Sequence, residues 1–182
     1  MIVSAFLGLA LSMGFMSCSD DDADAPGLEY ESQGFIKGSI TGVSEDGTYV
    51  FDDDFKYTDY SLLLNTLSTY ELNDDDSYEI DLRRADFGDY GNASISFDLE
   101  NAEDTTPDNI TISITWADEE DDRYITFTMG SSGNTVAITD FSFNPETGRA
   151  KGEFTLSGTN NSTDNNALVT GSFDVVAKPV VQ

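Results

Sequence analysis

The residues best equipped for chemistry are carboxylates, which gather in three short clusters. The clusters are Asp52-Asp53-Asp54, Asn73-Asp74-Asp75-Asp76 and Asp118-Glu119-Glu120-Asp121-Asp122. Ca²⁺ takes about six to eight oxygen ligands, often from loop carboxylates, so the second cluster predicts a calcium site with Asp74 and Asp76 as its first ligands. No cluster has the D-x-[DN]-x-[DN]-G spacing of a calcium loop, and a solvated hairpin tip is the alternative interpretation.

The residues that the chain lacks narrow the catalytic chemistry. There is no histidine and only one cysteine, which excludes a Ser-His-Asp triad, a Cys-His pair and an ordinary zinc site. A glycoside hydrolase needs two carboxyl groups about 5–10 Å apart in a cleft. The sequence contains 35 Asp and Glu residues but assigns no such pair. We therefore expect no enzyme and name no catalytic residue.

Aromatic side chains could offer a flat apolar face to a sugar. The candidates are Trp116, Tyr90 and Tyr124. Trp116 continues the alternating apolar face of Ile112 and Ile114, so core packing is the better interpretation for it. Tyr90 lies in a turn sequence, which makes it the predicted ligand-binding ring.

The charge balance limits the partners of the chain. Eight basic residues against 35 acidic ones give a net charge of −27. Such a chain repels nucleic acid and anionic lipid headgroups, so we expect no nucleic-acid partner. Cations, neutral sugars and basic partners remain open, and selection for a hydrated surface is the simpler explanation of the charge.

Apolar and polar residues alternate with period two through most of the chain, as expected for strands with one buried face. Turn sequences such as 45–48 separate these runs, and the first turn predicts a hairpin between 34–42 and 48–55. The pattern predicts an all-β fold of about 8–10 strands, either an antiparallel β-sandwich or a flattened barrel. The other strands are expected near 78–82, 94–99, 110–116, 125–129, 135–143, 149–157 and 167–177.

One segment departs from this alternation. Tyr57, Tyr60, Leu64 and Leu67 fall at helical spacing within 56–70, which predicts a short helix near 57–67 that plugs one end of the sheet. Two strands are the alternative, because Tyr and Thr favour strands.

The first 17 residues form an export signal in our interpretation. Residues 2–15 are almost wholly apolar, but a helix of this length is shorter than a bilayer core of about 30 Å. Acidic residues follow directly, which is typical of a signal peptide rather than a membrane anchor. A buried helix is the alternative.

The sequence Phe15-Met16-Ser17-Cys18 resembles a bacterial lipobox, in which the cysteine is acylated and becomes the mature N-terminus. Its loose form, with Phe15 where Leu is usual and a bulky Met16, is similar to the lipoboxes of Bacteroidetes lipoproteins. The resemblance implies lipidation of Cys18 and anchoring to the outer membrane, because several acyl chains hold a protein durably in a bilayer.

The residues after Cys18 indicate the side of the membrane. The acidic run is similar to the surface-export signal of Bacteroidetes lipoproteins, which implies display at the cell exterior; it consists of Ser19, Asp20, Asp21, Asp22 and Asp24. A solvated linker is the alternative. Residues 18–33 then form a flexible acidic tether, and 34–182 form a single domain.

Two further resemblances are local. The segments 138–143, 151–158 and 169–175 resemble the close of small Bacteroidetes lipoprotein domains that carry no established activity. Asp104-Thr105-Thr106 resembles the O-glycosylation acceptor motif of the same bacteria, with Thr105 as the acceptor.

These observations predict a surface-anchored lipoprotein that acts as a non-catalytic binding or accessory module for a glycan or an outer-membrane protein. A structural coat protein without a small ligand and a carbohydrate-active hydrolase are the alternatives.

Overall fold

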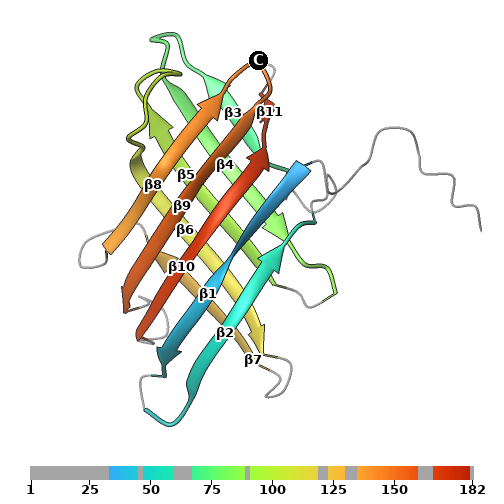
Figure 1. The fold of residues 1–182 in the computed structure, drawn as a ribbon, viewed down its shortest axis with the longest axis vertical. Coiled ribbons are helices and arrows are strands. Elements are labelled where there is room, and N and C mark those ends of the chain that lie inside the picture. Colours follow the sequence, from blue (N-terminus) through green and yellow to red (C-terminus); the bar gives the residue numbers. More distant parts are fainter. Residues whose placement is uncertain are drawn as a thin grey trace, which may run out of the picture.

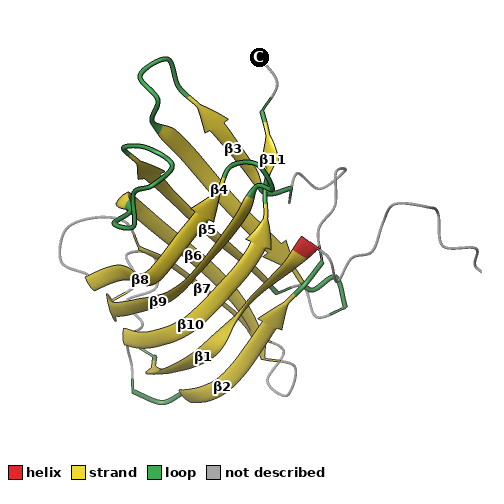
Figure 2. Ribbon diagram, turned by 45° about the horizontal axis from the view of Figure 1, so that its top comes forward, coloured by secondary structure: helices red, strands yellow, loops and turns green. Residues whose placement is uncertain are grey.

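The computed structural model describes residues 33–44, 47–59, 67–88, 91–118, 123–129, 135–159 and 166–180. These residues form eleven strands in two sheets that pack face to face (Figure 1). One residue of 3₁₀ geometry, Gln33, precedes the first strand (Figure 2). Within the described ranges, no helix is long and apolar enough to span a bilayer.

The first sheet has five strands in the order β2-β1-β10-β9-β8. Every neighbouring pair in it is antiparallel. Its outer strand β8 contains a register shift between Thr139 and Ser142, where Asp140 has a positive φ of 50°. The strands are β1 (Gly34–Val43), β2 (Val50–Tyr57), β8 (Thr135–Asn144), β9 (Arg149–Thr159) and β10 (Asn166–Val176).

The second sheet has six strands in the order β11-β3-β4-β5-β6-β7. The short β11 runs parallel to β3, and the other pairs are antiparallel. In Figure 1 the strands of this sheet run obliquely across those of the first. The strands are β3 (Thr69–Leu72), β4 (Tyr78–Ala85), β5 (Asn92–Leu99), β6 (Asp108–Asp118), β7 (Arg123–Met129) and β11 (Lys178–Pro179).

The sheets do not close into a barrel, so the predicted β-sandwich is confirmed and the flattened barrel is not. The predicted first hairpin is also confirmed, because β1 and β2 pair directly in antiparallel register. After β2 the chain crosses to the other sheet, where Asp59 and Ala85 exchange two backbone hydrogen bonds of 2.8 Å. β3 and β11 are additional strands that the alternation does not predict.

The core lies between the sheets and is filled by the apolar members of the alternating strands. Among the described residues, its aromatic rings contact one another in four groups, one of them the stacked pair of Phe55 and Tyr57. Phe51 contacts Trp116 and Phe127 near one end, and Phe97 contacts Phe141 and Phe173. The fourth group is Tyr70, Tyr78 and Phe143. Burial of rings on this scale is the main source of stability in such a sandwich.

Two paired glycines make room for rings in the first sheet. Gly38 lies opposite Gly171 in the register of β1 and β10. A Cβ at Gly38 would lie 2.2 Å from the carbonyl oxygen of Thr170, and one at Gly171 would lie 2.5 Å from the Phe154 ring. The sheet can therefore approach these groups closely only because both positions lack a side chain.

The helix expected near 57–67 is wrong where the structure describes that segment. Tyr57 is the last residue of β2 and stacks on Phe55, with ring centroids 5.2 Å apart. Tyr70 belongs to β3. Residues 60–66 lie outside the described ranges. The helical spacing counted Tyr57, which is the last inward-facing residue of the strand β2.

Candidate functional site

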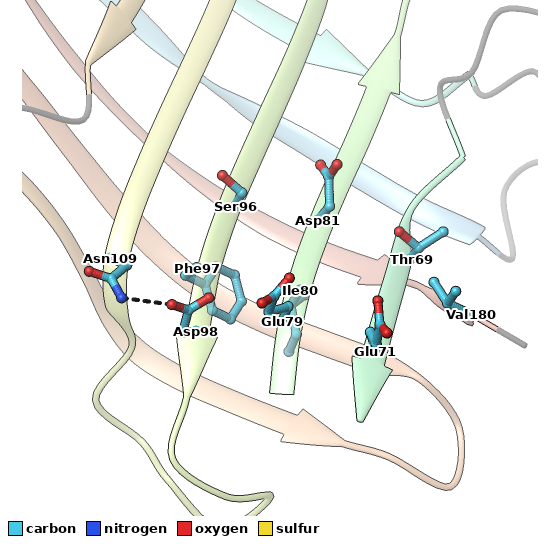
Figure 3. A pocket seen from close by; sticks show the side chains of 10 residues that line it. All are labelled: Thr69, Glu71, Glu79, Ile80, Asp81, Ser96, Phe97, Asp98, Asn109 and Val180. Atoms are coloured by element: carbon cyan, nitrogen blue, oxygen red, sulfur yellow. Dashed lines mark hydrogen bonds between the residues drawn. The ribbon is translucent and has the colours of Figure 1, made fainter. Parts of the chain in front are cut away.

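The outer face of the six-stranded sheet carries a shallow depression of about 490 Å³ (Figure 3). Its side chains come from five neighbouring strands or strand ends, so residues far apart in the sequence share one surface. The buried residues Ile80 and Phe97 line it from below. Its rim and walls are polar: Thr69, Glu71, Glu79, Asp81, Ser96, Asp98 and Asn109, with Val180 at one side.

Three carboxylates of the depression form a row across this face, and Asp108 continues the row opposite Asp98. Glu71 lies opposite Glu79 in the register of β3 and β4, and Glu79 lies opposite Asp98 in the register of β4 and β5. Directly opposed residues on a sheet have Cβ atoms about 4.5–5.5 Å apart, and like charges there are destabilising. The row therefore lowers the stability of the sheet and provides a dense set of hydrogen-bond acceptors.

Neighbouring polar groups orient two of the carboxylates on this face. The side-chain amide of Asn109 donates to Asp98 Oδ2 at 2.7 Å. Arg83 donates to Asp81 through Nε at 2.9 Å and Nη2 at 2.5 Å. This hydrogen bonding raises the pKa of Arg83, mainly through Asp81. Both side chains are about a third exposed, so the pair adds at most about 1 kcal/mol to stability.

The depression is open to solvent, and its carboxylates are exposed or half-buried. An open acidic surface can bind a basic protein segment or accept hydrogen bonds from hydroxyl groups. Catalysis by a carboxyl acid needs a different environment, because burial in an apolar pocket is what keeps such a group protonated near neutral pH.

The predicted calcium ligands lie in the turn between β3 and β4. Asp75 Oδ1 accepts hydrogen bonds from the Ser77 hydroxyl at 2.6 Å and the Ser77 amide at 3.2 Å. These bonds, the hydroxyl one first, lower the pKa of Asp75. Asp76 has a positive φ of 65°.

This geometry gives the acidic cluster a structural role as a tight turn. Asp74 and Asp76 are exposed. Among the described residues, no group of three or more His, Cys, Asp or Glu side chains could hold a metal ion. The structure therefore does not bring further acidic ligands to the two residues that the sequence singled out.

The cluster Asp52-Asp53-Asp54 is divided between the two faces of β2. Asp52 and Asp54 lie opposite Thr41 and Ser39 of β1 on the outer face. Asp53 has the inward parity of Phe51 and Phe55, and its Oδ2 accepts a hydrogen bond of 3.2 Å from Trp116 Nε1.

Trp116 is only 6% exposed, so its predicted place in the core is confirmed. Of the other two aromatic candidates, only the backbone of Tyr124 is described. Tyr124 pairs through its backbone with Ala117 in β7 and β6. Tyr90 lies outside the described residues.

A buried arginine is the feature that sequence analysis missed. Arg84 is 1% exposed, and its Nη1 donates to Ser68 Oγ at 2.8 Å and to the Arg83 carbonyl at 2.6 Å. Its Nη2 donates to the carbonyl of Gln33, and its Nε donates to that of Gly34 at 3.4 Å. The sequence did contain a signal for this burial. Residue 84 follows 80 and 82 at alternate positions of one strand, so its side chain points to the same inner face.

The predicted glycosylation site lies in the loop between β5 and β6. Thr105 is exposed there. The neighbouring Asp104 carboxylate accepts hydrogen bonds from the amides of Thr106 at 2.8 Å and Glu100 at 3.2 Å, so the loop backbone is held in place.

The remaining predicted residues lie outside the described ranges: Cys18, Ser19, Asp20, Asp21, Asp22 and Asp24. The third acidic cluster is described only at Asp118, whose backbone pairs with Arg123.

The chain was compared with known protein families, curated proteins and solved structures. No protein-family model, no curated protein and no solved structure matches the chain.

Proposed function

We propose that the protein is a surface-anchored lipoprotein whose β-sandwich acts as a non-catalytic binding or accessory module. The lipobox-like cysteine at position 18 and the acidic residues after it support the anchor and its export to the cell exterior. The domain then stands on a tether that ends at Gln33. The partner is an outer-membrane protein segment or a glycan.

The observation that carries the proposal is the way in which the domain begins. Arg84 donates to the carbonyl groups of Gln33 and Gly34, the residues at which the tether sequence meets β1. Because Arg84 belongs to the opposite sheet, this contact ties the entry point to both layers of the sandwich. The contact fixes the first residues of the domain, because chain ends of a domain fray unless they are held by such bonds.

The acidic depression is the binding surface in this proposal. The row Glu71–Glu79–Asp98 costs stability through like-charge contacts, and an attractive partner would offset that cost. Basic or hydroxyl-rich groups are complementary to such a row. The open, solvated setting of these carboxylates supports a binding role over hydrolysis.

The anchor is tested by mass spectrometry of the mature protein isolated from membranes. The proposal expects a chain that begins at Cys18 and carries acyl groups, and Cys18→Ala should move the protein out of the membrane fraction. A mature chain that keeps residues 1–17, or an unmodified terminus, would refute the anchor.

The binding surface is tested by chemical cross-linking on intact cells. The triple variant Glu71→Gln/Glu79→Gln/Asp98→Asn should lose the cross-linked products of the native protein. A matched control removes three exposed carboxylates that lie outside this depression and outside the hollow on the other sheet: Asp52→Asn/Glu100→Gln/Glu103→Gln. Equal cross-linking by the native protein and the triple variant would show that the acidic row is not the binding surface.

A further inference from the structure

The few basic residues of the chain are not spread evenly. The chain has eight Lys and Arg residues. In the described part, four of them lie on the outer face of the five-stranded sheet: Lys37, Lys56, Arg149 and Lys151. All four lie in the half of that face nearest Gly34, where the chain enters β1. The net charge of −27 predicts repulsion from anionic lipids for the chain as a whole, but half of its basic residues lie in this one region, which they share with Asp54, Glu153 and Asp174.

Two of these residues are directly opposed. Lys37 of β1 pairs in register with Lys56 of β2, and both are exposed. Neither forms an ion pair within the described residues, whereas Arg149 and Lys151 both bind Asp174, at 2.6 and 3.2 Å. Opposed like charges on neighbouring strands lower stability, so the lysine pair is not explained by folding.

The surface around the lysine pair is a hollow lined by hydrogen-bond donors. A shallow hollow of about 660 Å³ lies between the two lysines and the neighbouring strands β10 and β9. Small hydroxyl residues line it: Ser39, Thr170 and Ser172. Ser39 Oγ and Thr170 Oγ1 are 3.3 Å apart and hydrogen-bonded. Ammonium and hydroxyl donors together suit the oxygen atoms of a phosphate group.

Other groups define how a ligand would sit in this hollow. Asp54 and Glu153 also line it, so an anion is favoured on the side of Lys37 and Lys56 and disfavoured near these carboxylates. Lys37 Nζ lies 5.0 Å from the centroid of the half-buried Phe35 ring on the same face. An aromatic ring beside paired lysines is an arrangement that suits the interface of a lipid headgroup layer.

Lys37 and Lys56 lie close to the point at which the proposed tether joins the domain. If the tether is lipidated, the membrane is the anionic surface nearest to them. Lys37 is three residues beyond Gly34 in β1, which is about 10 Å along a strand. The tether that we propose to be lipidated ends at that same point. The carboxylate row lies on the outer face of the other sheet, about 10 Å or more away, and physiological salt screens charges beyond about 8 Å.

From these observations we propose that the Lys37–Lys56 face docks onto phosphate-bearing headgroups of the membrane to which the domain is tethered. This inference rests on the proposed lipid anchor. It gives the tethered domain a preferred orientation, with the basic face of the five-stranded sheet toward the bilayer and the acidic depression toward the surroundings.

The test places two reporters on the mature lipoprotein, reconstituted into vesicles that contain phosphatidylglycerol and a nitroxide-labelled headgroup lipid. A fluorophore is attached to Thr139→Cys, an exposed position in the same row of the five-stranded sheet, or to Thr128→Cys, an exposed position on the other sheet. The proposal expects quenching at position 139 to exceed quenching at position 128 by roughly twofold or more. Vesicles of phosphatidylcholine should abolish this difference.

The double variant Lys37→Gln/Lys56→Gln should also abolish the difference between the two reporters. Arg83→Gln/Lys178→Gln removes the same charge from the six-stranded sheet and should leave the difference unchanged. Circular dichroism and the fluorescence of Trp116 verify that each variant is folded.

Flotation of the vesicles separates the two proposals. Protein that does not float would refute the lipid anchor. Two results with protein that floats would refute the docking face. One is equal quenching at positions 139 and 128, and the other is a difference in quenching that persists in Lys37→Gln/Lys56→Gln. If the lysine variant loses binding to sulfated dextran while quenching is unchanged, the face recognises an anionic glycan and the membrane proposal is wrong.

Discussion

The indole N–H of Trp116 donates to Asp53 Oδ2 across the two sheets at 3.2 Å. Asp53 lies on the edge strand β2, and Trp116 lies on β6 of the other sheet. The Tyr57 hydroxyl donates to the Thr115 carbonyl at 2.8 Å, between the same two strands. The edge strand is therefore held to the opposite sheet by polar contacts as well as by ring packing. A carboxylate of inward parity on an edge strand also opposes pairing with another sheet.

Asp53→Ala should lower the free energy of unfolding by about 1 kcal/mol, because it removes the acceptor of a nearly buried N–H. The chain contains one tryptophan, so urea unfolding followed by its fluorescence measures the effect directly. Asp52→Ala removes an outward carboxylate of the same strand and should change stability by less than about 0.5 kcal/mol. Equal effects of the two substitutions would contradict the assigned hydrogen bond.

Arg84→Met should destabilise the domain by about 2–4 kcal/mol, because it leaves several buried carbonyl groups without their donor. Hydrogen exchange should show the loss first at the start of β1, since Arg84 donates to Gln33 and Gly34. Arg83→Met, on the exposed face, should cost less than about 1 kcal/mol. Unchanged exchange at the start of β1 would show that Arg84 does not fix this segment.

Asp174 should contribute stability that depends on pH. Its hydrogen bond with Arg149, followed by that with Lys151, lowers its pKa below the ordinary 3.8. A lowered pKa in the folded state means that the contribution is present above 3.8 and is lost as the pH falls through the folded value. The difference in unfolding free energy between the native protein and Asp174→Asn should therefore be constant from about pH 7 to pH 5 and shrink below about pH 4.

Denaturant titrations at several pH values measure this difference. Asp54→Asn serves as the control, because Asp54 is an exposed carboxylate of the same sheet face. A difference between the native protein and Asp174→Asn that stays constant down to about pH 2 would contradict the role of the ion pair.

Two glycines with similar backbone angles should respond differently to alanine. Gly47 and Gly148 have φ values of 70° and 67°. A Cβ at Gly148 would lie 2.0 Å from the Ala177 carbonyl oxygen, whereas one at Gly47 would meet nothing within 4 Å. Gly47→Ala should cost about 1–2 kcal/mol from the backbone alone, and Gly148→Ala should cost at least about 1 kcal/mol more. Thermal unfolding of the two variants provides the comparison.

The acidic residues after Cys18 should control surface display and leave folding unchanged. Replacing Asp20, Asp21, Asp22 and Asp24 with Ala should reduce protease accessibility on intact cells, because it removes the proposed export signal. Replacing the exposed Asp52, Asp54, Asp74 and Asp76 removes the same charge from the domain and should leave display unchanged. Equal accessibility of the native and first-variant proteins would contradict the export signal.

Local alternation was sufficient to predict most strands and the identity of the core. Ile95, Phe97 and Leu99 are buried because each second residue of a strand faces the same side. β3 lacks this signal, since its Leu72 is exposed and it spans only Thr69–Leu72. The two-residue β11 is too short for any periodic pattern.

The surfaces could not be predicted, because they depend on contacts between distant strands. Glu71, Glu79 and Asp98 become neighbours only through the pairing of β3, β4 and β5. Lys37 and Lys56 become neighbours through one hairpin register, which the predicted turn at 45–48 implied but did not specify. The acidic run at 73–76 was visible in the sequence, but its use as a turn follows from hydrogen bonds that composition does not encode.

The position of β1 inside its sheet has a mechanical consequence. β1 pairs with β10 along ten residues, Gly34–Val43, and with β2 from Ile36 to Val43. A force applied along this strand at Gly34 must shear two hydrogen-bond ladders together, whereas an edge strand would be separated from only one. The chain thus enters its domain through a strand whose load is shared by two hydrogen-bond ladders, a geometry that resists unfolding by a force applied at Gly34.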